Sequence, residues 1–209
     1  MKLVVFSTTD RSLSEAREVT QMFEEGLRAF HIKKSGFERH EMEEYLKVIP
    51  PKYHRYIILH SNHKLRKSFK LGGLHLSRTH RKKKYNSWWK MFKLRKFSRK
   101  LKFTRTFSKL SSLTKNKTKY DYVFLGPIYD SISKLGHSGN FGNRSLKRYI
   151  STSKSPVYAL GGITPDKLEE CKELGFSGVC VLGYIWNNEH QTPIEAFREV
   201  KNKLKELEH

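Results

Sequence analysis

The chain has 209 residues, with 42 Lys and Arg against 20 Asp and Glu and a formal net charge of +22. This length predicts one domain over residues 1–206, and we interpret Leu207–His209 as the remnant of a purification tag. No apolar run approaches the roughly 20 residues of a membrane span, and Met1–Asp10 lacks a signal-peptide layout. Cys171 and Cys180 show no CxxC spacing, so we expect a reduced, cytoplasmic protein.

The positive charge is concentrated in one part of the chain. Between Glu44 and Asp121 there is no acidic residue, and 24 of the 42 Lys and Arg lie there. Within this part, residues 81–102 alternate cations with aromatic residues. We expect an insertion that packs on the domain or on a partner subunit, with weak binding of polyanions as a secondary property. Its apolar residues do not form one helical stripe, which argues against a membrane-surface helix.

The remaining chain alternates between two patterns. Short apolar runs predict buried strands at Lys2–Phe6, Phe30–Ile32, Tyr56–Leu59, Gly73–Leu76, Phe103–Phe107, Tyr122–Leu125, Val157–Leu160 and Gly178–Leu182. Helices are expected between them at Ser14–Leu27, Phe37–Val48, Asn62–Lys70, near Leu110, around Leu146–Ile150, at Pro165–Leu174 and at Pro193–Glu206, the last two capped by the threonine before each proline. Eight such units predict an α/β fold, a (β/α)8 TIM barrel with a basic insertion after strand 4; an open doubly wound sheet is the alternative.

Two glycine-containing loops follow neighbouring strands. Gly126–Gly142 comes after the sixth strand, and Gly161–Ile163 comes after the seventh, directly before Thr164. Glycine lets backbone N–H groups approach an anion, and barrel enzymes often bind phosphate after strands 7 and 8. The loops therefore predict a phosphate pocket, with Lys134 as its point charge.

Four stretches carry a family resemblance: GLHL at Gly73–Leu76, DYVFLGPIYDSISK at Asp121–Lys134, YALGGI at Tyr158–Ile163 and GVCVLGYIW at Gly178–Trp186. In this order and spacing the chain resembles the thiamine phosphate synthase/TenI superfamily. The resemblance implies a transferase of thiamine biosynthesis that binds thiazole phosphate and couples it to hydroxymethylpyrimidine pyrophosphate. A TenI-like thiazole tautomerase, and a non-catalytic barrel that binds phosphate ligands or polyanions, are the alternatives. A homodimer is one arrangement consistent with the resemblance.

The resemblance also assigns binding residues. It implies that pyrophosphate contacts Ser131, Ser133 and Lys134. It implies that the thiazole phosphate lies against Gly161, Gly162, Leu182 and Gly183. Lys33 corresponds to the basic residue after strand 2, and Thr106 to the serine of strand 5.

The chain departs from the family at two places. The synthase branch handles Mg²⁺ with an Asn-Asp pair after strand 3 and an aspartate after strand 4; here His60-Ser61 and approximately His80 stand there. Because Mg²⁺ prefers carboxylate oxygens, a magnesium site would lack its usual ligands. The histidine of the tautomerase branch is replaced by Ser108.

Three histidines, His31, His60 and His75, fall near the ends of strands 2, 3 and 4. Imidazole suits proton transfer near neutral pH, so His60 or His31 is a candidate acid/base. Three histidines on adjacent strands are also compatible with a metal such as zinc, or with purely local hydrogen bonding. We expect His75, Thr106 and Ser108 to line the substrate site.

Overall fold

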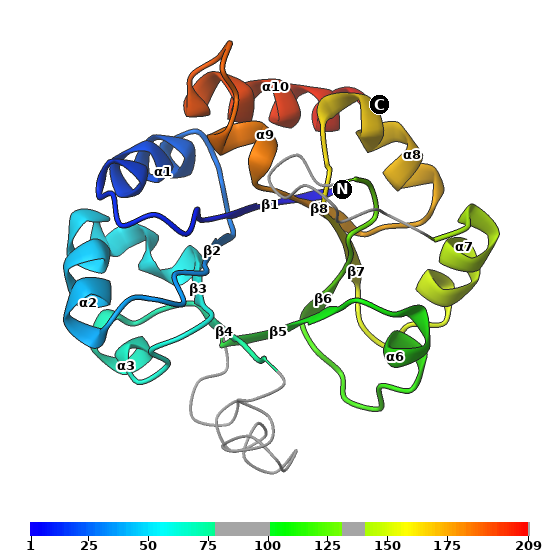
Figure 1. The fold of residues 1–209 in the computed structure, drawn as a ribbon, viewed down its shortest axis with the longest axis horizontal. Helices are drawn as coiled ribbons and strands as arrows, with labels where there is room; N and C mark the ends of the chain where they lie inside the picture. Colours follow the sequence, from blue (N-terminus) through cyan, green and yellow to red (C-terminus); the bar gives the residue numbers. More distant parts are fainter. Residues whose placement is uncertain (78–100, 131–140, 209) are drawn as a thin grey trace.

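The computed structural model describes residues 1–77, 101–130 and 141–208. Its parallel strands form a closed barrel in sequence order (Figure 1): β1 (Lys2–Phe6), β2 (Phe30–Ile32), β3 (Ile57–Leu59), β4 (Gly73–His75), β5 (Lys102–Phe107), β6 (Tyr122–Leu125), β7 (Val157–Leu160) and β8 (Gly178–Val181). The ring closes where β1 pairs with β8, with Leu3 opposite Val179. The predicted (β/α)8 barrel is therefore confirmed, and the open sheet is excluded.

Helices surround the strands (Figure 1): α1 (Ser14–Glu24), α2 (Arg39–Val48), α3 (Leu65–Phe69), α6 (Leu110–Thr114), α7 (Asn143–Ser151), α8 (Leu168–Glu173), α9 (Gly183–Trp186) and α10 (Pro193–Glu206). Two 3₁₀ turns, η1 (Pro51–Tyr56) and η2 (Pro165–Lys167), complete the described elements. The sequence patterns did not predict η1 or α9. Among the described residues, no helix has the length and apolarity needed to cross a membrane.

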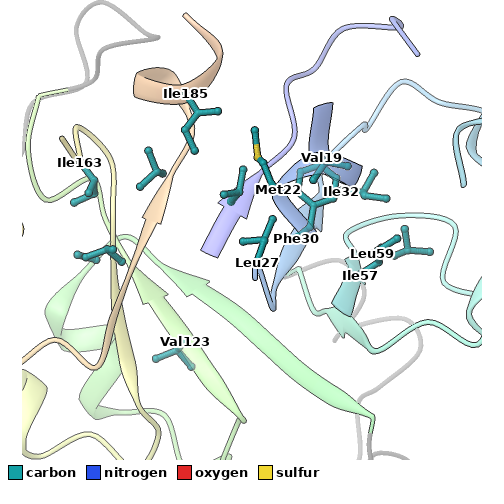
Figure 2. Close-up of a cluster of buried hydrophobic side chains, with 14 of the residues drawn as sticks. Val19, Met22, Leu27, Phe30, Ile32, Ile57, Leu59, Val123, Ile163 and Ile185 are labelled. Atoms are coloured by element: carbon teal, nitrogen blue, oxygen red, sulfur yellow. The ribbon is translucent and has the colours of Figure 1, made fainter. Parts of the chain in front are cut away.

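The buried side chains form two layers, one on each side of the barrel wall. The outer layer joins helices to strands; Figure 2 shows Val19 and Met22 of α1 beside Phe30 and Ile32 of β2. The inner layer fills the barrel with Val4, Phe6, Ala29, Ile58, Tyr122, Phe124, Tyr158 and Cys180. Burying one large apolar side chain contributes about 1.5–3 kcal/mol, so both layers stabilise the barrel.

The two threonine caps have different outcomes. Thr192 caps α10 as predicted, because its hydroxyl accepts a hydrogen bond from the Glu195 N–H at 3.4 Å. Thr164 does not cap a helix; its hydroxyl donates to Asp166 Oδ1 at 2.5 Å instead. The helix predicted at Pro165–Leu174 correspondingly begins with the turn η2 before α8.

Contacts define two segment boundaries, the end of the insertion and the C-terminus. Lys102 is the first residue of β5, opposite Gly73, so it belongs to the barrel rather than to the insertion. Leu101 is buried, and residues 81–100 lie outside the described part of the chain. Leu207 packs against the core, and the Glu208 carboxylate accepts a hydrogen bond from the Met1 amino group at 2.7 Å. These two C-terminal residues therefore take part in the fold.

Candidate active site

Three histidines meet inside the barrel near the C-terminal ends of β2, β3 and β4. His31 lies opposite Ile58, and His60 follows Ile58 by two residues, so both histidines point to the interior face. His75 ends β4 and lies opposite Thr104 of β5. One ring nitrogen of each histidine lies within 4.8 Å of a ring nitrogen of each of the others. The alternation of strand side chains is therefore what assembles the cluster.

Each imidazole of the cluster has defined neighbours. His31 Nδ1 lies 2.9 Å from His60 Nε2, and His31 Nε2 lies 2.7 Å from the Tyr122 hydroxyl. His75 Nδ1 lies 2.9 Å from Thr104 Oγ1, and its Nε2 lies 3.3 Å from Thr106 Oγ1. The His60 and His75 rings stack with centroids 3.9 Å apart. The local hydrogen bonding considered for these histidines is thus present, and it links them into one network.

Two imidazoles of the cluster, those of His31 and His60, are held neutral by their surroundings. Burial lowers the pKa of His31 well below its usual value, with smaller contributions from His75 and Lys102. The pKa of His60 is also well below its usual value, mainly through burial and then through His75, His31 and Lys33. Both imidazoles therefore carry no charge at neutral pH.

A cavity of about 690 Å³ opens above the cluster. Its described walls include five of the residues singled out from the sequence: Lys33, His60, His75, Thr106 and Ser108. His31 is fully buried and contributes to the cavity only through its hydrogen bond to His60. The position of the cavity agrees with the barrel rule that active sites lie at the C-terminal ends of the strands.

The cavity walls are basic. Lys33, Arg105 and Lys109 line it, and its described lining residues include no Asp or Glu. Sequence reasoning missed Arg105 and Lys109, although both lie in the part of the chain without acidic residues. Such a wall attracts anionic ligands.

Two adjacent lysines after β2 have separate environments. Lys33 reaches the cavity, and its backbone N–H donates to Ser7 Oγ at 2.8 Å. Lys34 is fully buried and forms an ion pair with Glu15 at 2.5 Å. The choice of Lys33 as the ligand-facing lysine is thus consistent with the geometry, and Lys34 is structural.

The glycines after β7 are required by the neighbouring β6 loop. Gly161 and Gly162 have φ of 96° and 64°. A Cβ on Gly162 would lie 2.3 Å from the Asp130 carbonyl oxygen, and one on Gly161 would lie 2.8 Å from Pro127 Cβ. The Gly161 carbonyl accepts a hydrogen bond from the Tyr129 N–H at 3.2 Å. Only glycine lets these two loops approach so closely.

Leu182 and Gly183 form the turn between β8 and the short helix α9. Trp186 at the end of α9 donates its indole N–H to the Phe6 carbonyl at 2.6 Å. This bond fixes the turn beside the end of β1, and β8, which the turn follows, pairs with both β1 and β7. A short helix after strand 8 is a recurring part of phosphate sites in this architecture. Ser131, Ser133 and Lys134 lie outside the described residues.

A second cavity of about 630 Å³ lies at the opposite, N-terminal end of the barrel. Lys2, Lys102 and Asp121 mark this end, since they lie at the starts of β1, β5 and β6. The rings of Tyr122 and Tyr158 stack there with centroids 4.6 Å apart. Tyr122 therefore belongs to the lower cavity while its hydroxyl contacts His31. Sequence reasoning did not single out Tyr122.

The residues present do not fit a family-type magnesium site. No carboxylate is among the described lining residues of the upper cavity, and residues 78–100 and 131–140 contain no Asp or Glu. Glu15 is occupied by Lys34, and Asp130 is exposed outside the lining. A hard ion such as Mg²⁺ needs oxygen ligands that this wall does not supply.

The fold and the site define a (β/α)8-barrel protein with a basic ligand cavity at the C-terminal ends of its strands. The sequence profile described as thiamine monophosphate synthase matches residues 3–185. The chain therefore belongs to the thiamine monophosphate synthase family, which confirms the resemblance seen in its motifs.

Individual relatives agree with this assignment. The crystal structure of thiamine phosphate pyrophosphorylase from Bacteroides thetaiotaomicron is 31% identical, with a TM-score of 0.79 and coverage of 100% of both chains. Thiamine-phosphate synthases from Levilactobacillus brevis and Lactococcus lactis subsp. cremoris are 39% and 29% identical over 62 and 84 residues. These two matches cover 30% and 40% of this chain, and they span 29% and 38% of those proteins. These relatives are named as synthases, so the tautomerase alternative is not favoured.

Proposed function

We propose that the protein joins a thiazole phosphate to hydroxymethylpyrimidine pyrophosphate, forming thiamine phosphate and releasing pyrophosphate. The bond between the pyrimidine methylene carbon and the pyrophosphate oxygen breaks, and a bond from that carbon to the thiazole nitrogen forms. The observation that carries the proposal is the basic upper cavity, which gathers Lys33, His60, His75 and Thr106 in a barrel of this family. The two cysteines of the protein, Cys171 and Cys180, are buried and free, which is consistent with action in the cytoplasm.

The leaving pyrophosphate needs positive charge where its negative charge develops. Lys33 faces the cavity and is fixed through its backbone by Ser7. We assign Lys33 to the leaving group, together with Lys134, Ser131 and Ser133 of the loop after β6. A positive charge placed where the negative charge of the leaving group develops stabilises the transition state.

The thiazole phosphate is assigned to the opposite wall of the mouth. Gly161 and Gly162 follow β7, and the Leu182–Gly183 turn follows β8, its neighbour in the barrel. Backbone N–H groups without shielding side chains suit the three oxygens of a phosphate. This placement leaves the thiazole ring over the centre of the cavity.

Proton transfer is assigned to His60, since its imidazole reaches the cavity while that of His31 does not. A pyrophosphate bound beside the ring would stabilise its protonated form. His60 can then hold a proton at Nδ1, the ring nitrogen that does not contact His31, and give it to the leaving pyrophosphate. His31 would position His60 through the 2.9 Å contact between their ring nitrogens.

Incubation with both substrates, with and without Mg²⁺, tests the proposal through the formation of thiamine phosphate. We expect product, with a weaker dependence on Mg²⁺ than carboxylate-bearing relatives show. Binding of thiazole phosphate without product under any cation would instead identify a binding protein.

A variant separates phosphate recognition from loop shape. Lys134→Ala should weaken binding of the phosphorylated thiazole by roughly 1.5–3 kcal/mol, the contribution of a charged hydrogen bond. The unphosphorylated alcohol should bind almost unchanged in the same calorimetric titration. Equal losses for both ligands would show that Lys134 only shapes the loop.

A further inference from the structure

We propose that His31, His60 and His75 form a binding site for one divalent transition-metal ion of the zinc type. Their ring nitrogens lie within 4.8 Å of one another, and the pair His31 Nδ1 and His60 Nε2 is only 2.9 Å apart. In a tetrahedral zinc site with Zn–N bonds of about 2.0–2.1 Å, ligand nitrogens are about 3.3 Å apart. The His31–His60 pair is therefore close to the required spacing, and the widest pair of the cluster has to shorten by up to about 1.5 Å.

The outer ring nitrogens are already anchored. The Tyr122 hydroxyl lies 2.7 Å from His31 Nε2, and Thr104 Oγ1 lies 2.9 Å from His75 Nδ1. When these two nitrogens donate to the hydroxyls, His31 Nδ1 and His75 Nε2 carry lone pairs, and an ion at His75 Nε2 would replace its 3.3 Å contact with Thr106 Oγ1. Metal-binding histidines almost always donate their other N–H to such a partner, which fixes the tautomer and the ring orientation. This second observation distinguishes the cluster from a chance gathering of imidazoles.

Binding of an ion also requires the His60 ring to change its tautomer and its orientation. With a lone pair on His31 Nδ1, the proton between the two rings lies on His60 Nε2. A bound ion therefore needs that proton to move to His60 Nδ1, a change of tautomer without a change of charge. His60 must also tilt from its stack on His75, and both rings line the upper cavity.

The environment determines which ion binds and how tightly. Lys33 faces His60, and Lys102 acts on His31, so nearby positive charge weakens the site. Nitrogen ligands favour Zn²⁺, Co²⁺ or Ni²⁺ over Mg²⁺. The side of the cluster that faces the upper cavity supplies an open coordination position for water or a phosphate oxygen. A bound ion would thus supply positive charge at the cavity, where the carboxylates that Mg²⁺ needs are missing.

Direct binding tests the site without any measurement of activity. Untagged protein treated with a chelator is titrated with Co²⁺, whose visible absorption reports nitrogen ligation. We expect one Co²⁺ per chain, displaced by Zn²⁺ and not by millimolar Mg²⁺. Failure of the proposed coupling reaction would leave this titration unaffected, because no substrate is present.

Variants locate the ion. Tyr122→Phe should lower Co²⁺ affinity about 10-fold, within the range of about 10- to 100-fold found when ligand-supporting partners are removed. His60→Gln removes a ligand and should lower the affinity more, by at least about 100-fold. His190→Ala, on an exposed loop, is the matched control and should leave affinity unchanged. Circular dichroism confirms that each variant folds, and His75→Gln replaces His60→Gln if needed. Unchanged Co²⁺ affinity in the folded cluster variants, an equal loss in His190→Ala, or no saturable binding would overturn the proposal.

Discussion

Lys34 and Glu15 form an ion pair inside the protein, with 2.5 Å between Nζ and Oε2 and both side chains almost completely buried. The pair joins the segment after β1 to the start of the loop after β2, because Lys34 Nζ also donates to the Asp10 carbonyl at 2.6 Å. Burial raises the pKa of Glu15 despite the opposing effect of Lys34. The two loops are therefore tied together below the mouth of the cavity.

Replacing one partner of this pair should destabilise the protein strongly. We expect Lys34→Met to lower the free energy of unfolding by about 3–5 kcal/mol, because Glu15 is then buried without its partner. Urea denaturation measures the loss. Lys33→Met, one residue away and exposed, is the control and should change stability by less than about 0.5 kcal/mol. Equal losses in both variants would show that the ion pair is not the cause.

Activity, unlike stability, should depend on Lys33. Lys33→Met should lower kcat/KM for the pyrophosphate substrate roughly 10- to 100-fold, from the 1.5–3 kcal/mol of a charged hydrogen bond. Thiamine phosphate formation under varied pyrophosphate substrate gives the value. An exposed lysine away from the mouth, as in Lys115→Met, should leave kcat/KM unchanged. The assignment of Lys33 to the leaving group is wrong if the two variants behave alike.

The buried histidines should make stability depend on pH. The pKa values of His31 and His60 are below that of an unfolded histidine, so the unfolded state binds more protons below about pH 6.5. Stability should therefore fall as pH decreases from about 6.5, by up to about 1.4 kcal/mol per pH unit for each histidine. Urea denaturation from pH 7.5 to 5 measures this slope, and His31→Gln should reduce it. The same slope in wild type and variant would contradict the linkage.

Removing the imidazole at the cavity should affect turnover more than ligand binding. We expect His60→Ala to lower turnover by about 10²–10⁴, the usual contribution of a positioned acid or base. The affinity for thiazole phosphate, measured by calorimetry, should remain, since that ligand is assigned to the far wall of the mouth. Thr104→Val, which removes the hydroxyl behind His75, is the milder comparison. Normal turnover in His60→Ala would leave His60 as a structural residue.

A methyl group at the β7 loop should disturb both loops at once. Gly162→Ala places Cβ against the Asp130 carbonyl and forces alanine into φ of 64°, so we expect a loss of about 1–3 kcal/mol in stability. Weaker binding of thiazole phosphate should accompany it. Gly142→Ala is the matched control, because a Cβ there meets nothing within 4 Å. Thermal unfolding of both variants measures the loss of stability, and calorimetry measures their affinity for thiazole phosphate.

The sequence predicted most of the barrel because its strands are short apolar runs buried on both faces. Lys2–Phe6 and Tyr122–Leu125 were predicted with the same bounds that the structure shows. The misses have local causes. Helix α9 has four residues, too few for a helical period, and η1 begins at prolines that indicate a break. The side chain of Thr164 found a nearer acceptor in Asp166, which no pattern reveals.

Prediction of the site was limited by contacts between distant segments. The three histidines were identified because each stands near the end of a strand. Their hydrogen bonds to Tyr122 and Thr104 depend on which strand faces which across the interior, and that follows from the register of the closed barrel. Likewise, the different environments of Lys33 and Lys34 depend on Glu15, which lies on a helix 18 residues before Lys33 in the numbering.

The bond between Tyr122 and His31 crosses the barrel from β6 to β2 and connects its two ends. Tyr122 lines the lower cavity, and His60, joined to His31, lines the upper one. One chain of hydrogen-bonded side chains therefore couples the ring of His60 at the upper cavity to the hydroxyl of Tyr122, whose side chain lines the lower one.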